Sequence, residues 1–364
     1  MKVCGVICEL NPAHNGHKYI FDKAREVTGA DYLIAVMSGD FVQRGEPAIF
    51  DKHIRTKSAL LMGADAVLEI PGIFATGSAQ YFARGAVALL NKLGCVDALV
   101  FGSETGELKK INDDEQAGPN DILGSEYLKA LEFFGSDIKP FAVTRIGTGY
   151  NDDKNTSGNI CSASFLRKMI ESGNGDIYGL MPDDCQELII NHINKNAPVF
   201  FDDFSDVFFE TLRKHKDTGL SDYYDIYDDL SDKLLNPLDK YTSAEDYCHI
   251  VKTKEVALAH IKRAMLHVAL GYTKEDVEYA KANDYYIYSR LLGFRNAGKE
   301  VLSMIGESGT QMISKTADYD KITDGKSAEI YKKDISASGL YQYIKQKKDK
   351  SGIINEFTRG VIVL

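Results

Sequence analysis

Short apolar runs and longer amphipathic stretches alternate through the first half of the chain. The runs are almost uninterrupted, as in strands covered on both sides, and predict strands at residues 3–8, 32–37, 66–70, 96–101 and 141–145. The stretches between them predict helices at residues 18–28, 51–62, 79–93, 121–134 and 162–172. This βαβ rhythm predicts an α/β fold, a parallel sheet with helices on both faces.

The pattern changes near residue 190. Asp- and Tyr-rich segments follow, together with helical patterns at residues 254–270 and 274–283. We therefore predict a doubly wound α/β domain over residues 1–190 and a mostly helical domain over residues 191–364. Two polar stretches without periodicity, residues 102–120 and 147–159, are expected to be loops of the first domain.

Composition narrows the class of protein. The 364 residues are 44% hydrophobic, which is enough for a full core. No apolar run approaches the roughly 18 residues that cross a bilayer, and the first residues lack the apolar centre of a secretory signal. The six cysteines are scattered without a C-x-x-C pair. These features predict a cytoplasmic protein with free thiols and no membrane partner.

Charge is unevenly distributed along the chain. The net charge of −10 argues against a nucleic-acid partner for the chain as a whole. However, residues 201–250 carry 5 basic and 13 acidic side chains, a net charge of −8, whereas residues 251–350 carry 18 basic and 13 acidic ones, a net charge of +5. Only the later segment offers a basic face, and such a face is also common on ordinary solvated surfaces.

The most informative segment, residues 9–17, follows the first predicted strand directly. It contains His14 and His17, with Gly16 between them. In an open α/β sheet, ligands bind beyond the carboxyl ends of the strands, where a helix start presents free N–H groups to an anion. Gly16 lets the backbone approach a nucleotide closely, and the two imidazoles can stabilise charge on a phosphate.

Two other interpretations of the histidines remain open. They can be helix caps or surface residues, or they can ligate zinc, although no Cys, Asp or His partner recurs nearby at a convincing spacing. A P-loop pattern and a dinucleotide-type G-x-G-x-x-G are both missing after this strand.

The segment His14-Asn15-Gly16-His17 resembles the H-x-G-H signature of the nucleotidyltransferase superfamily. Four further segments, at residues 37–48, 101–104, 119–124 and 161–168, are similar to the pattern of bacterial tRNA(Met) cytidine acetate ligases. The resemblance is close through about residue 185, and beyond it only residues 291–295 are recognisable. It implies a Rossmann-like (HUP-type) nucleotidyltransferase domain followed by a tRNA-binding one.

The resemblance also implies a reaction. Such ligases are expected to form acetyl-adenylate and pyrophosphate from ATP and acetate, and then to acetylate the wobble cytidine of elongator tRNA(Met). Adenylation gives acetate a good leaving group, and that step needs charge stabilisation at phosphate more than a dedicated base. Mg²⁺ is expected with ATP, although no carboxylate cluster marks a protein site for a metal.

Family roles carry over onto matching positions. His14 and His17 would be catalytic. The ATP contacts would be Ile7, Cys8, Glu9, Leu10, Asn11, Pro12, Ala13, His14, Asn15, Gly16, His17, Lys18, Tyr19, Ile20, Gly102, Asn120, Arg145 and Ile146. A second signature, in which hydroxyls and a cation at a helix start hold the outgoing phosphates, would comprise Ser162, Ser164 and Arg167. A simple helix cap explains the two serines equally well.

Cations and stackable rings in the second half suit RNA, whose unpaired bases stack on aromatic side chains. The predicted tRNA contacts are Arg263, Arg290, Arg295 and Lys299, with the rings of Tyr285, Tyr286 and Tyr288. The alternative is that these tyrosines form the core of a helical domain.

Two departures from the family pattern stand out. The connection from Gly102 to Asn120 is short, and Asn151 stands where histidine is expected. Two other functions are compatible with the same histidine pair and ATP crevice: an adenylyltransferase acting on a small metabolite or another carboxylate, and a nucleotide-binding sensor without catalysis.

Overall fold

The computed structural model describes residues 1–111, 118–146, 159–173, 177–195 and 198–364. Asn151 and nearly all of the polar stretch 147–159 lie outside the described residues.

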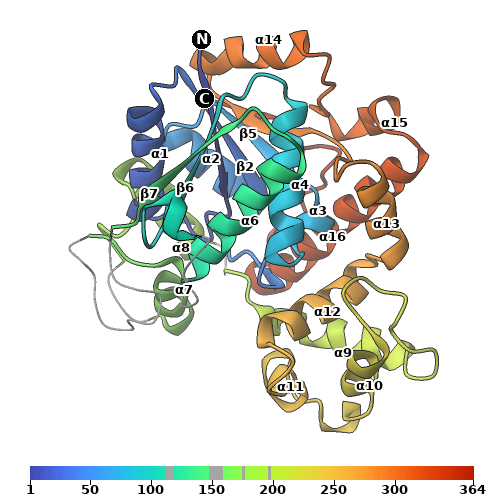
Figure 1. The fold of residues 1–364 in the computed structure, drawn as a ribbon. Coiled ribbons are helices and arrows are strands. Elements are labelled where there is room, and N and C mark those ends of the chain that lie inside the picture. Colours follow the sequence, from blue (N-terminus) through green and yellow to red (C-terminus); the bar gives the residue numbers. More distant parts are fainter. Residues whose placement is uncertain (112–117, 147–158, 174–176, 196–197) are drawn as a thin grey trace.

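The centre of the protein is a sheet to which seven strands of the described residues belong (Figure 1). Its order is β7-β6-β1-β2-β5-β8-β9, formed by β7 (Lys139–Thr144), β6 (Ala98–Ser103), β1 (Val3–Cys8), β2 (Tyr32–Ser38), β5 (Ala66–Ile70), β8 (Arg290–Phe294) and β9 (Ile362–Val363). The first five of these run parallel, whereas β8 pairs with β5 in the antiparallel sense. The predicted mostly parallel α/β fold is thus confirmed.

Helices cover both faces of the sheet, and each face has its own apolar core. On one face lie α1 (Asn15–Thr28), α2 (Lys52–Leu61) and α8 (Asp183–Lys195). On the other lie α3 (Gly72–Ala75), α4 (Ala79–Lys92) and α6 (Pro119–Phe133). This arrangement follows from the nearly continuous apolar runs of the strands, which have no face to expose to water.

Local chemistry sets the helix starts. The α1 helix begins at Asn15, three residues before the predicted start, because His14 caps it. The α6 helix begins at Pro119, two residues early, since proline is well suited to the first helical position. Part of the expected loop 102–120 is also helical, at α5 (Leu108–Ile111).

The later part of the chain is largely helical, as expected. Its elements are α7 (Ala163–Ser172), α9 (Ser205–Lys214), α10 (Asp228–Leu235), α11 (Ala244–Val251), α12 (Leu258–Leu270), α13 (Lys274–Ala282), α14 (Lys299–Glu307), α15 (Tyr319–Ile322) and α16 (Gly325–Asp349). Short 3-10 turns lie at η1 (Phe201–Phe204), η2 (Leu238–Lys240), η3 (Asn296–Gly298) and η4 (Thr316–Asp318). A hairpin of β3 (Phe41–Val42) and β4 (Glu46–Pro47) completes the described elements.

The strands β8 and β9 were not predicted. They add residues 290–294 and 362–363 to the sheet, so the sheet draws on both of the predicted domains. The division at residue 190 stays a prediction from the sequence. In Figure 1, helices α9 to α12 project below the sheet, at the carboxyl ends of its parallel strands.

A buried ionic cluster ties β8 and the C-terminal segment to the sheet. Arg290 lies 3.2 Å from Glu69 and 2.5 Å from Glu356. Lys52 completes the cluster, with its Nζ 2.9 Å from Glu69 and 3.3 Å from Glu356. All four side chains are buried, so each charge is neutralised inside the protein.

Within the described ranges, helices that combine the length and the apolar character needed to cross a membrane are lacking.

Candidate active site

The order of the sheet places a crevice between β1 and β6. From β1 the chain proceeds to β2 and β5 on one side, whereas β6 and β7 lie on the other. Ligands of open α/β sheets bind where the strand order reverses in this way, beyond the carboxyl ends of the strands. The segment with the two histidines follows β1 at this point.

His14 and His17 face each other at the start of α1. Their ring centroids are 3.8 Å apart. The Nδ1 atom of His14 accepts a hydrogen bond from the backbone N–H of Gly16 at 3.0 Å, and Nδ1 of His17 accepts one from the backbone N–H of His14 at 3.3 Å. An imidazole nitrogen that accepts carries no proton, so each neutral ring carries its proton on Nε2.

The surroundings keep both rings neutral. Burial lowers the pKa of His14 well below its usual value, and the neighbouring His17, Arg145 and Arg167 lower it further. Burial, together with the charge of Arg145, lowers the pKa of His17 to about 3. The pair therefore offers two Nε2–H donors without a positive charge of its own.

The turn between β1 and His14 is fixed from three directions. The side-chain oxygen of Asn11 accepts from the backbone N–H of Ile49 at 2.9 Å, and the carbonyl of Asn11 accepts from Arg167 at 2.8 Å. The carboxylate of Glu9 accepts from the backbone N–H of Gln43 at 2.8 Å. Leu10 adopts a φ of 49°, a left-handed conformation that such contacts must hold in place.

The other wall of the crevice comes from β6 and β7. A Cβ atom added to Gly102 would lie 3.1 Å from Cγ of Arg145 and 3.3 Å from Cδ1 of Ile20, so only glycine lets these side chains come so close. Arg145 donates to the side-chain oxygen of Asn120 at 3.0 Å, and the amide nitrogen of Asn120 donates to Glu104 at 2.5 Å. Both Arg145 and the following Ile146 are exposed to solvent.

The predicted second signature lies beside the turn. Ser162 caps α7 by accepting from the backbone N–H of Phe165 at 3.1 Å, and its hydroxyl lies 3.0 Å from that of Ser164. Arg167, one turn further along α7, reaches back to Asn11. The side chain of Asn15 donates to the carbonyls of Asn159 and Gly179, each at 2.7 Å, and so joins α1 to the segments that flank α7.

The structure thus brings the predicted ATP contacts together. The residues at the end of β1, in the turn and in the first turns of α1 form one wall, and Gly102, Asn120 and Arg145 form the other. Ile7, Cys8, Leu10, Asn11, Pro12, Ala13 and Ile20 are buried, whereas Glu9, Asn15, Gly16, Lys18 and Tyr19 are half-buried. Their contact with ATP remains a prediction.

The predicted tRNA contacts are not brought together. Arg290 is 5% exposed and neutralised by Glu69 and Glu356, so we withdraw it as an RNA contact. Arg263 on α12 lies 3.3 Å from Asp225 and is largely covered. Arg295 and the exposed Lys299 lie beyond the amino end of β5, at the sheet edge opposite the crevice. Of the three tyrosines, Tyr285 and Tyr288 are buried.

Arg55 is a site residue that the sequence reasoning missed. Its guanidinium is 1% exposed and donates to the carbonyls of Glu9 at 2.6 Å and Ser38 at 3.1 Å, as well as to Gly39. These carbonyls end the adjacent strands β1 and β2, so Arg55 fastens the two strand ends together. The sequence does offer a signal for Arg55: it is a basic residue at a position of the predicted helix 51–62 that faces the sheet.

In the part of the chain that the structure describes, His, Cys, Asp and Glu side chains form no group of three that could hold a metal ion. The zinc interpretation of the two histidines therefore finds no partner among these residues.

Comparisons with known proteins agree with this fold. The sequence matches the HIGH Nucleotidyl Transferase family over residues 1–117 and 112–354. It is 32% identical to the tRNA(Met) cytidine acetate ligase of Acetivibrio thermocellus, covering 100% of both chains, and 36% identical to that of Caldicellulosiruptor saccharolyticus, covering 88% of both. The crystal structure of Thermotoga maritima TmcAL bound with alpha-thio ATP is similar, with a TM-score of 0.90 and 28% identity over 100% of both chains.

Proposed function

The chain belongs to the tRNA(Met) cytidine acetate ligases of the HIGH nucleotidyl transferase family, and on that premise we propose that it activates acetate with ATP and acetylates the wobble cytidine of elongator tRNA(Met). The observation that carries the proposal is the pair of neutral histidines at the crevice between β1 and β6. A Thermotoga maritima relative that binds an ATP analogue has the same fold.

The first step is adenylation. A carboxylate oxygen of acetate forms a bond to the α-phosphorus of ATP, and the bond from that phosphorus to the bridging oxygen breaks, so pyrophosphate leaves with the electron pair. Negative charge grows on the phosphate oxygens during this step. We assign the Nε2–H groups of His14 and His17 as donors to these oxygens, which would lower the barrier.

Neutral rings suit this task. A preorganised donor inside a protein stabilises developing charge without reorganising at the moment of reaction. Formal positive charge comes instead from Arg145 on one side and Arg167 on the other, both close enough to lower the pKa of His14. We assign Arg145 and Arg167 to the phosphates, because the planar guanidinium matches phosphate oxygens in pairs.

The second step transfers the acetyl group. The exocyclic amine of cytidine attacks the acetyl carbonyl, the bond between that carbon and the phosphate oxygen breaks, and AMP leaves while the nitrogen loses a proton. An unpaired anticodon loop exposes this amine without the opening of a duplex.

ATP reaches such enzymes as its Mg²⁺ complex, and the ion neutralises part of the triphosphate charge. The described residues offer no metal-binding group of three, so we propose that the ion is held by the triphosphate and water. A cytoplasmic location, where ATP, acetate and tRNA occur together, fits this function.

The experiment that tests the function is acetate-dependent exchange of labelled pyrophosphate into ATP, run with and without tRNA. Exchange with acetate, followed by transfer of labelled acetate to tRNA(Met), is expected. Exchange without transfer to tRNA would indicate an adenylyltransferase with another acceptor. If wild-type protein and the His14→Ala and His17→Ala variants all lack turnover while binding ATP, the protein is a sensor.

A further inference from the structure

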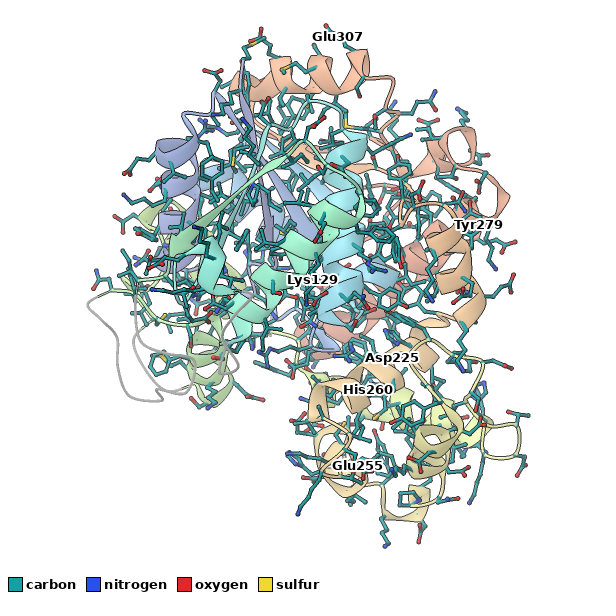
Figure 2. The ribbon with its side chains drawn as sticks, viewed as in Figure 1. Lys129, Asp225, Glu255, His260, Tyr279 and Glu307 are labelled. Carbon is teal, nitrogen blue, oxygen red and sulfur yellow. The ribbon has the colours of Figure 1, made fainter. Side chains whose placement is uncertain are left out.

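One surface of the protein, on the face of the sheet opposite α1, combines cations with aromatic rings. It follows one side of α4, where Tyr81, Arg84, Ala88, Asn91 and Lys92 succeed one another at intervals that place them on one helix face. We refer to these five residues as the α4 strip. Figure 2 shows the side chains of α4 between α6, which carries Lys129, and α13, which carries Tyr279.

Each cation of this surface lies over a ring. The guanidinium carbon of Arg84 is 4.3 Å from the ring centre of Phe133, at the end of α6. The Nζ atom of Lys92 is 5.2 Å from the ring of Tyr286, and that of Lys281 is 5.7 Å from the ring of Tyr81. Phe133 is 53% exposed, so the ring held by Arg84 presents an uncovered surface to solvent.

A cavity of about 600 Å³ adjoins the strip. Asn91 and Lys92 line it from α4, Phe134 lines it from the end of α6, and Asn283, Asp284 and Tyr286 line it from the segment after α13. Asp324 also lines it, but its carboxylate accepts from the hydroxyl of Tyr279 and from the backbone N–H of Ser327 at the start of α16. That segment is strained, because Asp284 and Tyr285 have φ values of 50° and 57°. The volume is in the range of pockets that hold small ligands, and it is sufficient for a nucleotide.

The chemistry of this surface favours RNA. Lysine and arginine attract phosphates, and exposed aromatic rings stack on unpaired bases. The amide oxygen of Asn91 accepts from Ser136 and the amide nitrogen of Asn283 donates to the carbonyl of Tyr279, so the Asn91 nitrogen and the Asn283 oxygen are the groups that can meet base edges. The carboxylate of Asp284, which is exposed at the cavity, can accept from the amino groups of bases.

We propose that the α4 strip and the adjoining cavity bind unpaired nucleotides of the tRNA. This inference rests on the proposed function and names the surface that holds its RNA substrate. The α4 helix begins after β5, at the edge of the sheet where the histidines lie, and its 14 residues span about 21 Å toward the opposite edge. An RNA whose loop enters the crevice can thus continue along the strip.

The test measures binding of an unmodified tRNA(Met) transcript by fluorescence anisotropy over a range of salt concentrations. The variants are Lys92→Glu, Arg84→Glu and Phe133→Ala. Lys23→Glu is the matched control, since Lys23 is a partly exposed cation on α1, on the other face of the sheet. Acetate-dependent pyrophosphate exchange without tRNA is measured for every protein, and light scattering gives its oligomeric state.

We expect each charge reversal to weaken binding about tenfold and to reduce the salt slope by about 0.7 to 0.9, as for a lost phosphate contact. Phe133→Ala should weaken binding about 5- to 100-fold with the salt slope retained, as for a lost stacking contact. Exchange without tRNA should be unchanged, and Lys23→Glu should bind like the wild type.

Wild-type affinity in Lys92→Glu and Phe133→Ala would overturn the proposal, as would equal weakening by the control. If light scattering shows a wild-type dimer and monomeric strip variants with RNA affinity intact, that result would also overturn it, in favour of a second copy of this chain as the occupant. Because Lys92 and Phe133 are exposed, these two variants keep the test valid if Arg84→Glu fails to fold. A wild-type protein that forms adenylate but acetylates no tRNA would instead refute the proposed function.

Discussion

The rings of His14 and His17 lie with their centroids 3.8 Å apart, and each accepts a backbone N–H at Nδ1. The helix start thereby fixes the tautomer of both rings and leaves both Nε2–H groups as donors. The pair is therefore a preorganised, uncharged donor site, which is suited to charge that appears only in the transition state.

Replacing His17 by Ala should slow adenylation by roughly 2 to 4 kcal/mol, the scale of losing one donor to a developing charge. Pyrophosphate exchange at saturating ATP and acetate measures the loss. His249→Ala, at an exposed position of α11, is the control and should exchange normally. Unchanged exchange in His17→Ala would remove His17 from the mechanism.

Acidification should destabilise the fold through His14. Its pKa is lowered in the folded protein, so below about pH 6.5 the unfolded chain binds a proton that the folded chain does not. The free energy of unfolding should fall by up to about 1.4 kcal/mol per pH unit from this residue alone. Urea unfolding of wild type and His14→Gln between pH 7.5 and 5 measures the difference, and parallel pH curves for the two proteins would contradict it.

Replacing Gly102 by Ala should impair ATP binding more than stability. The added methyl group would press on Arg145 and Ile20 and displace the guanidinium from its place beside Asn120. Loss of one charge-assisted hydrogen bond to phosphate corresponds to about a tenfold increase in KM for ATP. Steady-state exchange kinetics measure the KM, and thermal unfolding measures the stability. A lower melting temperature with an unchanged KM for ATP would contradict the prediction.

Replacing Arg55 by Lys should show that the guanidinium fork, rather than its charge, is needed. The ammonium group cannot reach the carbonyls of Glu9, Ser38 and Gly39 at once, and buried acceptors left unsatisfied cost about 1 to 3 kcal/mol each. Urea unfolding should therefore reveal a loss of at least about 1 kcal/mol, with a higher KM for ATP. Wild-type values of both quantities would show that the strand ends hold together without Arg55.

Replacing Glu356 by Gln should destabilise the protein by about 3 to 5 kcal/mol, because it leaves buried positive charge without its partner. Burial alone would raise the pKa of Glu356, but Lys52, His53 and Arg290 together lower it. Its carboxylate is therefore charged in the fold at neutral pH. Glu26→Gln, which breaks an exposed pair with Lys23, is the control and should cost less than about 1 kcal/mol in the same urea titration.

Much of the fold could be predicted because apolar periodicity is a local signal. The runs of inward-facing residues predict the five parallel strands and the helices between them. The histidine segment comes directly after the first of these strands. The sequence pattern did not predict the strand β8, because five residues within a helical region are too short a pattern. Its pairing with β5 also joins residues more than 200 positions apart, which no local pattern reports.

The sequence by itself determined the α/β class, the position of His14 and His17 after the first strand, and the family resemblance, because each depends on residues close together in the chain. The tertiary structure alone decided which charges face solvent. Arg290, a basic residue like any other in the sequence, lies between Glu69 and Glu356 inside the protein, whereas Arg84 lies on an exposed ring. Burial and charge pairing depend on segments that meet only after folding, so no local pattern reports them.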